Sequence, residues 1–274
     1  MFMQKIRKST QKNRTILIIV VAVLTIGLVG SFAVWNSDDY RNETGYGEMT
    51  TEEQIATYEQ YVADATPAAG VEMDYASASS LANYYTQLRS LYYTASTEYA
   101  ATDTAKSTEY YDKSIDAATK AAEYFQFQLD NAPENMNDYA KALLMGNRAS
   151  ALSFTGEMDE ARALYEEAVT LSPDNFEVAQ NYVTFIYSQD GIDAAKEYAE
   201  QYKEMVGEES DNYAAMDEVI KYYESVEEFY KNLEQVKEEE AAAEGENADE
   251  NADENTGDTE AADEEEEETE EEAE

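Results

Sequence analysis

The chain has 274 residues, of which 61 are acidic and 18 basic, so its formal net charge is −43, and it contains neither cysteine nor histidine. These two absences exclude zinc fingers, thiol nucleophiles and histidine-based catalytic triads. No segment beyond the N-terminus is basic, so nucleic acid is not an expected partner.

The first 35 residues predict a membrane anchor. Residues 1–14 carry five bases and no acid, and an uncharged run from Thr15 to Ser37 follows them. Because about 20 apolar residues cross a bilayer, residues 15–35 are predicted to form a transmembrane helix in contact with lipid. The positive-inside rule then places residues 1–14 in the cytoplasm and the rest of a single-pass cell-membrane protein outside it. A cleaved signal peptide is the alternative, because Ser31-Phe32-Ala33 resembles a cleavage site.

A helical domain is predicted to follow a short stalk. Residues 36–49 contain glycines and charges without periodicity, which indicates the stalk, and residues 50–236 form the predicted domain. Its first helix begins at a capping box of Thr50 and Glu53 and ends before Pro67. Two longer helices are predicted from about residue 77 and over residues 104–129, because apolar residues recur there at helical spacing.

The most informative stretch of the domain lies between residues 147 and 175. It combines a helix-closing glycine, one helix face of three residues and a proline stop: Gly156, Ala161, Tyr165, Ala168 and Pro173. These residues resemble a tetratricopeptide repeat (TPR), a helix-turn-helix unit of 34 residues, over residues 142–175. Residues 176–209 keep the register, since Ala195 lies 34 residues after Ala161. The likeness is to bacterial TPR proteins with an N-terminal membrane anchor, and it implies an all-α fold, a TPR-like α-solenoid.

Two segments complete the chain. An amphipathic helix over residues 211–236 is predicted to cap the solenoid, with a coiled-coil seam as the alternative. Residues 237–274 contain no aromatic or large aliphatic side chain and hold 21 acids, so they are predicted to be a disordered acidic tail. Such a tail would bind divalent cations only weakly and diffusely, because the one stretch with EF-hand spacing has Thr256 where the loop requires glycine.

Asn147 and Asn181 are the leading candidates for a binding site. They lie one repeat apart, and the resemblance places both on the inward face, where TPR proteins that hold extended peptides use asparagine to hydrogen-bond the ligand backbone. A carboxamide suits this task because it both donates and accepts. Arg148 and Tyr187 complete the predicted peptide-binding site. The alternative interpretation is two polar residues on a solvated surface.

Catalysis is not expected. The nucleophile-elbow, Walker, Rossmann and HExxH patterns are absent from the sequence, so we expect no catalytic residue, cofactor or dedicated metal site. The expected function is a membrane-tethered extracytoplasmic adaptor that binds exported proteins, or their translocation or assembly machinery, through the concave helix face. The alternative is a structural spacer of the cell envelope with a cation-binding acidic tail.

Overall fold

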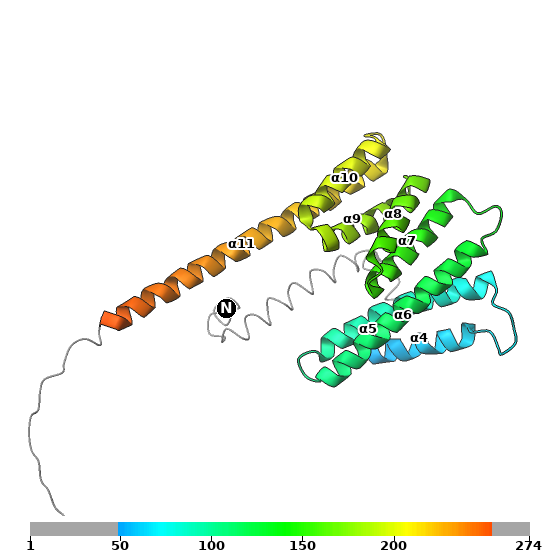
Figure 1. The fold of residues 1–274 in the computed structure, drawn as a ribbon, viewed down its shortest axis with the longest axis horizontal. Coiled ribbons are helices and arrows are strands. Elements are labelled where there is room, and N and C mark those ends of the chain that lie inside the picture. The colour runs from blue at the N-terminus through cyan, green and yellow to red at the C-terminus, as the bar shows by residue number, and fades with distance from the viewer. Residues whose placement is uncertain (1–48, 254–274) are drawn as a thin grey trace, which may run out of the picture. The chain divides into compact units, whose positions relative to one another are not determined.

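The computed structural model describes residues 49–253, with side chains to residue 236, and this part of the chain is α-helical without any strand (Figure 1). The prediction of an all-α fold is confirmed. The helices are α4 (Thr51–Ala65), α5 (Tyr75–Tyr99), α6 (Thr104–Asp130), α7 (Asp138–Thr155), α8 (Met158–Leu171), α9 (Phe176–Asp190), α10 (Ile192–Val206) and α11 (Asp211–Asp253).

The predicted anchor lies outside the described residues. Residues 1–14, the predicted transmembrane helix 15–35 and nearly all of the predicted stalk 36–49 belong to the part of the chain that is not described. Between residues 49 and 253, no helix combines the length and apolarity that crossing a bilayer requires.

Local signals set most of the helix boundaries. The predicted capping box at α4 is present, with Glu53 N–H donating to Thr50 Oγ1 at 3.2 Å and Thr50 N–H to Glu53 Oε2 at 2.8 Å. Helix α5 begins two residues before the predicted start, because the Asp74 carboxylate accepts from Ser77 N–H at 2.7 Å and caps the first turn. Gly156 ends α7 with φ 101°, a left-handed conformation that favours glycine.

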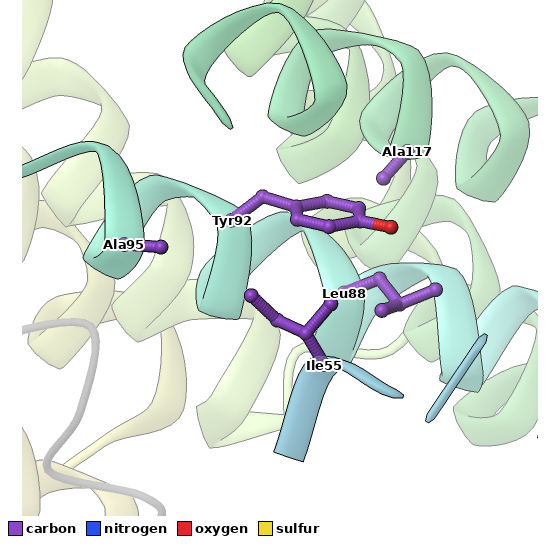
Figure 2. Packing of buried hydrophobic residues seen from close by; sticks show 5 residues of the cluster. All are labelled: Ile55, Leu88, Tyr92, Ala95 and Ala117. Atoms are coloured by element: carbon purple, nitrogen blue, oxygen red, sulfur yellow. The ribbon is translucent and has the colours of Figure 1, made fainter. Parts of the chain in front are cut away.

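Helices α4, α5 and α6 share a core of their own. Figure 2 shows the ring of Tyr92 between Ala117 of α6 on one side and Ile55 and Leu88 on the other. At the edge of this core the Tyr92 hydroxyl donates to Glu59 Oε1 at 2.6 Å, and the Tyr99 hydroxyl donates to Glu52. Ile55 is the one buried residue of α4, and Tyr58 and Val62 of the same helix pack, partly buried, against this core.

The next four helices form two hairpins, α7–α8 and α9–α10. The small residues Ala149, Ala161 and Ala168 are fully buried at the helix contacts, and Tyr165 is 2 % exposed. Helix α7 also packs closely against α9. A Cβ atom at Gly146 of α7 would lie 3.0 Å from Val178 Cγ2 of α9, so the absence of a side chain at Gly146 allows this approach.

The last helix starts against α10 and ends later than predicted. Asn212 Nδ2 donates to the Asp174 carbonyl at 2.9 Å and to the Tyr202 hydroxyl at 3.2 Å, while Lys203 forms an ion pair with Asp217. Helix α11 then continues to Asp253 instead of ending near residue 236. The prediction of disorder is therefore wrong for residues 237–253, because alanine and glutamate favour a helix even where no apolar face exists. Residues 254–274 lie outside the described part.

Candidate functional site

The two predicted asparagines occupy equivalent places on neighbouring helices. Asn147 lies on α7 and Asn181 on α9, both partly buried, and these two helices pack against each other. Neither carboxamide hydrogen-bonds to any other residue between 49 and 236, whereas Asn137, Asn175 and Asn212 all use theirs to cap or link helices. Asn147 and Asn181 therefore offer unused donors and acceptors on adjacent helices.

Arg148 does not join Asn147 in one binding face. Its guanidinium forms an ion pair with Glu160 of α8 at 2.5 Å, and its side chain is 17 % exposed. Successive residues of a helix point about 100° apart, so Arg148 is turned away from Asn147 towards the partner helix of the hairpin. Its Nε is buried without a hydrogen-bond acceptor among the described residues. This geometry gives Arg148 a role in holding α7 to α8.

Tyr187 is also separated from the asparagine that was predicted to accompany it. Six residues along a helix correspond to about 240° of rotation, so Tyr187 and Asn181 lie on different faces of α9. Tyr187 is partly buried and has an interaction of its own. The structure thus brings Asn147 and Asn181 to neighbouring helices and does not gather all four predicted residues.

Sequence reasoning missed Arg89, which is the most unusual charge of the helical domain. Its Nη1 donates to Ser150 Oγ of α7 at 3.3 Å, and its guanidinium carbon lies 5.4 Å from the centre of the Phe154 ring. No carboxylate of the described residues lies within ion-pairing distance of Arg89. Burial lowers the pKa of the Arg89 guanidinium, and the neighbouring Tyr165 phenol partly opposes this shift.

Almost every other base in this part of the chain lies against an acid. These paired bases are Lys106, Lys113, Lys120, Arg148, Arg162, Lys196, Lys203 and Lys231. Lys141, which also lacks an ion pair among the described residues, is exposed to solvent. Arg89 differs because it is partly buried and still has no acidic partner, although acids outnumber bases in the chain by 61 to 18.

Three aromatic rings from three helices follow one another, starting from the Phe154 ring at this guanidinium. Tyr93 of α5, one turn after Arg89, meets Phe154 of α7 edge-on with ring centres 5.7 Å apart. Tyr111 of α6 lies 6.5 Å from Tyr93. Tyr93 is 37 % and Tyr111 46 % exposed, which is high for such large rings. We refer to Arg89, Tyr93, Tyr111 and Phe154 as the Arg89 cluster.

A sequence signal for the Arg89 cluster existed but is indirect. Arg89 is the only base between Arg41 and Lys106, and no acid lies three or four residues from it in either direction. By contrast, Lys113 and Lys120 have Glu109 and Glu123 within one turn. A base with no acid within one helical turn therefore has to find its partner on another helix.

Comparison with known proteins assigns no family to this arrangement. No protein-family model matches the chain, and no curated protein is significantly similar to it.

Proposed function

We propose that the chain is a membrane-tethered, extracytoplasmic adaptor of the TPR type that binds extended segments of other proteins. The proposal has three elements: a TPR-like solenoid, a transmembrane helix at residues 15–35 and a location outside the cytoplasm. Support for the TPR-like part comes from two successive helix hairpins with a common 34-residue register, seen at Ala161 and Ala195, both of which are fully buried.

The observation that carries the proposal is the pair Asn147 and Asn181. A carboxamide that makes no hydrogen bond to its own protein keeps its donors and its acceptor free for water or for a ligand. Here two equivalent carboxamides on adjacent helices have no such bond among the described residues. Two amides spaced along neighbouring helices can hold the backbone of an extended segment without reading its sequence.

Photo-crosslinking in the native membrane tests this function. A photoreactive amino acid placed at Asn147 or Asn181 should crosslink to another protein, whereas the same amino acid at the exposed Glu167 of α8 should not. The double variant Asn147→Ala/Asn181→Ala, labelled at a neighbouring position of α7, should lose the crosslink. Equal crosslinking from Glu167 would contradict binding at the asparagine face.

Protease protection tests the proposed location. Protease added to intact cells that lack an outer permeability barrier should digest the helical domain and leave residues 1–35 protected. A helical domain that stays intact until the cells are lysed would contradict the extracytoplasmic orientation.

A second candidate function is an envelope spacer, which the length of α11 favours because this helix of 43 residues continues into the acidic segment as far as Asp253. Deleting residues 238–274 separates the two functions. An adaptor keeps its crosslinked partner after the deletion, whereas a spacer that works through its acidic tail loses its effect in cells.

A further inference from the structure

We propose that the stretch of α11 from Tyr222 to Val236 pairs with the same stretch of a second copy of this chain, so that two α11 helices form a short coiled coil. Pairing of this kind goes beyond the proposed function, because it concerns the association of two copies and does not involve the asparagine face.

A row of apolar side chains follows this part of α11 at the spacing of a coiled coil. Its members alternate at intervals of four and three residues: Tyr222, Val226, Phe229, Leu233 and Val236. These intervals keep the side chains on the one stripe of a helix that faces a partner helix. The helix is unbroken through the whole row (Figure 1). The row ends at Val236, because Glu240 occupies the next position at this spacing.

Much of this row is exposed in the single chain. Phe229 is 47 % and Val236 50 % exposed, and Tyr230 beside the row is 37 % exposed. The rings of Phe229 and Tyr230 meet edge-on with their centres 5.8 Å apart, so they form one aromatic surface. Val226 is already buried, and the surface available to a partner therefore centres on Phe229, Leu233 and Val236.

The charged residues of this stretch all lie away from the row. Five of them occur between Tyr222 and Val236, each at an outer position of the heptad: Glu224, Glu227, Glu228, Lys231 and Glu234. The positions that flank the row hold only uncharged side chains: Tyr223, Ser225, Tyr230 and Asn232. Flanking positions lie next to the partner helix in a coiled coil and select it by charge. Here they carry no acid, although acids outnumber bases in the chain by 61 to 18.

This distribution favours a second copy over a basic partner. A basic helix would gain from acids at the flanking positions, and the row offers it none. Two copies of the chain, each with a formal net charge of −43, repel each other through their carboxylates. Along the row and its uncharged flanks they can approach without bringing carboxylates together. Identical rows also match by symmetry, since each apolar side chain of one helix meets an equivalent space on the other.

The one base of this stretch is used within its own helix. Lys231 forms an ion pair with Glu227, one turn earlier, on the side of α11 that faces away from the row. It is therefore not needed for contact with an acidic partner. The row is only about 20 Å long, so we expect the pair to be weak in dilute solution and favoured where copies are concentrated.

Cysteine crosslinking in cells tests the pairing, because the chain has no cysteine of its own. Two full-length copies with different epitope tags, both carrying Tyr230→Cys, are produced together and treated with a permeable bis-maleimide whose spacer bridges adjacent helices but not their outer faces. Tyr230 flanks the middle of the row, so the two cysteines lie near each other in either helix orientation. We expect a crosslinked product that carries both tags. The matched control is Gln235→Cys at an outer position, which should give little of this product.

A charge placed in the row should separate the two helices. Phe229→Glu, added to the Tyr230→Cys chain, should lower the yield of the doubly tagged product about tenfold, because it removes a central aromatic side chain and sets a carboxylate against its copy. Gln235→Glu adds the same charge at an outer position and should retain the product. Circular dichroism of the purified variants should show unchanged helix, since Phe229 is half-exposed in the single chain.

Three results would overturn the pairing: no product that carries both tags, equal yields from Tyr230→Cys and Gln235→Cys, or a yield that Phe229→Glu leaves unchanged. A product that joins Tyr230→Cys to a different protein, without the second tag, would also contradict pairing of two copies. Asn147→Ala/Asn181→Ala should leave the doubly tagged product unchanged, so a failure of the proposed function and a failure of the pairing are distinguishable.

Discussion

Helix α7 meets helices α9 and α5 in different ways. Towards α9 the backbones come close, because Gly146 has no side chain to hold Val178 away, and the surrounding residues are buried and apolar. Towards α5 the contact is made by long side chains, with Arg89 meeting Ser150 and Tyr93 meeting Phe154. The first junction stabilises the fold through packing, while the second leaves polar and aromatic groups accessible. Helix α7 thus packs backbone to backbone on one side and presents polar and aromatic side chains on the other.

Filling the close junction should have the largest effect. Gly146→Leu puts a large side chain where Val178 Cγ2 already lies 3.0 Å from the position of a Cβ atom. Overpacking of this kind costs about 3 kcal/mol in the free energy of unfolding. Urea unfolding followed by circular dichroism measures it, with Ala163→Leu at an exposed position of α8 as a control expected to change stability by less than about 0.5 kcal/mol. Equal stability of the two variants would mean that α7 and α9 do not depend on this approach.

Alkaline pH should have the next largest effect on stability, because it ionises the buried Tyr182 of α9. Burial, followed by the hydrogen bond to Glu166, raises the pKa of Tyr182 from 10.0 to about 12. A group with a raised pKa in the folded state contributes stability that is fully present below pH 10 and is lost as the pH rises towards 12. Parallel measurements of tyrosinate absorbance and helical circular dichroism should show both changing in this window. Titration of all tyrosines near pH 10 with the helices intact would indicate that the rings are solvated.

Replacing Arg89 should cost less stability than replacing Arg148. Arg89→Met removes a partly buried charge that has no acidic partner among the described residues, so we expect a change of about 0–1 kcal/mol in either direction. Arg148→Met separates an ion pair with Glu160 and should destabilise by about 1 kcal/mol. Thermal unfolding of the two variants under the same conditions compares them directly. A larger loss for Arg89→Met would assign Arg89 to the structural side of the comparison.

The smallest effect is expected at α4, outside both junctions. The hydrogen bond from Tyr99 is the main cause that lowers the pKa of Glu52 below 4.5, so acidification through that lowered pKa should release this contact. Glu52→Gln should mimic the release at neutral pH and increase hydrogen exchange in α4 while leaving α7–α10 unchanged. Glu53→Gln, which alters the cap of the same helix without touching Tyr99, separates loss of docking from loss of helix formation. Unchanged exchange in Glu52→Gln would show that the docking of α4 does not depend on the contact with Tyr99.

Helix boundaries could be predicted from the sequence because their signals are local. Each signal acts on the few residues next to it. A helix begins at Thr50 with Glu53, and helices end at Gly156 and just before Pro173. The burial of the small residues near Tyr165 followed from spacing along a single helix face. The placement of Asn147 and Asn181 on neighbouring helices could be predicted because residues one repeat apart lie on adjacent units of a solenoid.

The features that were missed depend on what is absent or distant. The fold brings Ser150 and Phe154 to Arg89 but brings no carboxylate of the described residues within ion-pairing distance. No local sequence pattern predicts this environment. Arg148 was assigned to binding because its partner Glu160 lies on another helix, and no local pattern predicts an ion pair between two helices. The end of α11 was misplaced because a composition without apolar residues was read as disorder, whereas its alanines and glutamates favour a helix.

The attachment of α4 has a mechanical consequence. A pull applied to the chain at residue 49 loads α4 first. This helix is held by buried Ile55, by the partly buried Tyr58 and Val62, and by carboxylates that accept from Tyr92 and Tyr99. Phenol–carboxylate contacts at a surface reform quickly after they break, because water can replace either partner. Helix α4 would therefore detach under tension and dock again when the load falls. Its reversible detachment would limit the force that reaches the hairpins α7–α8 and α9–α10.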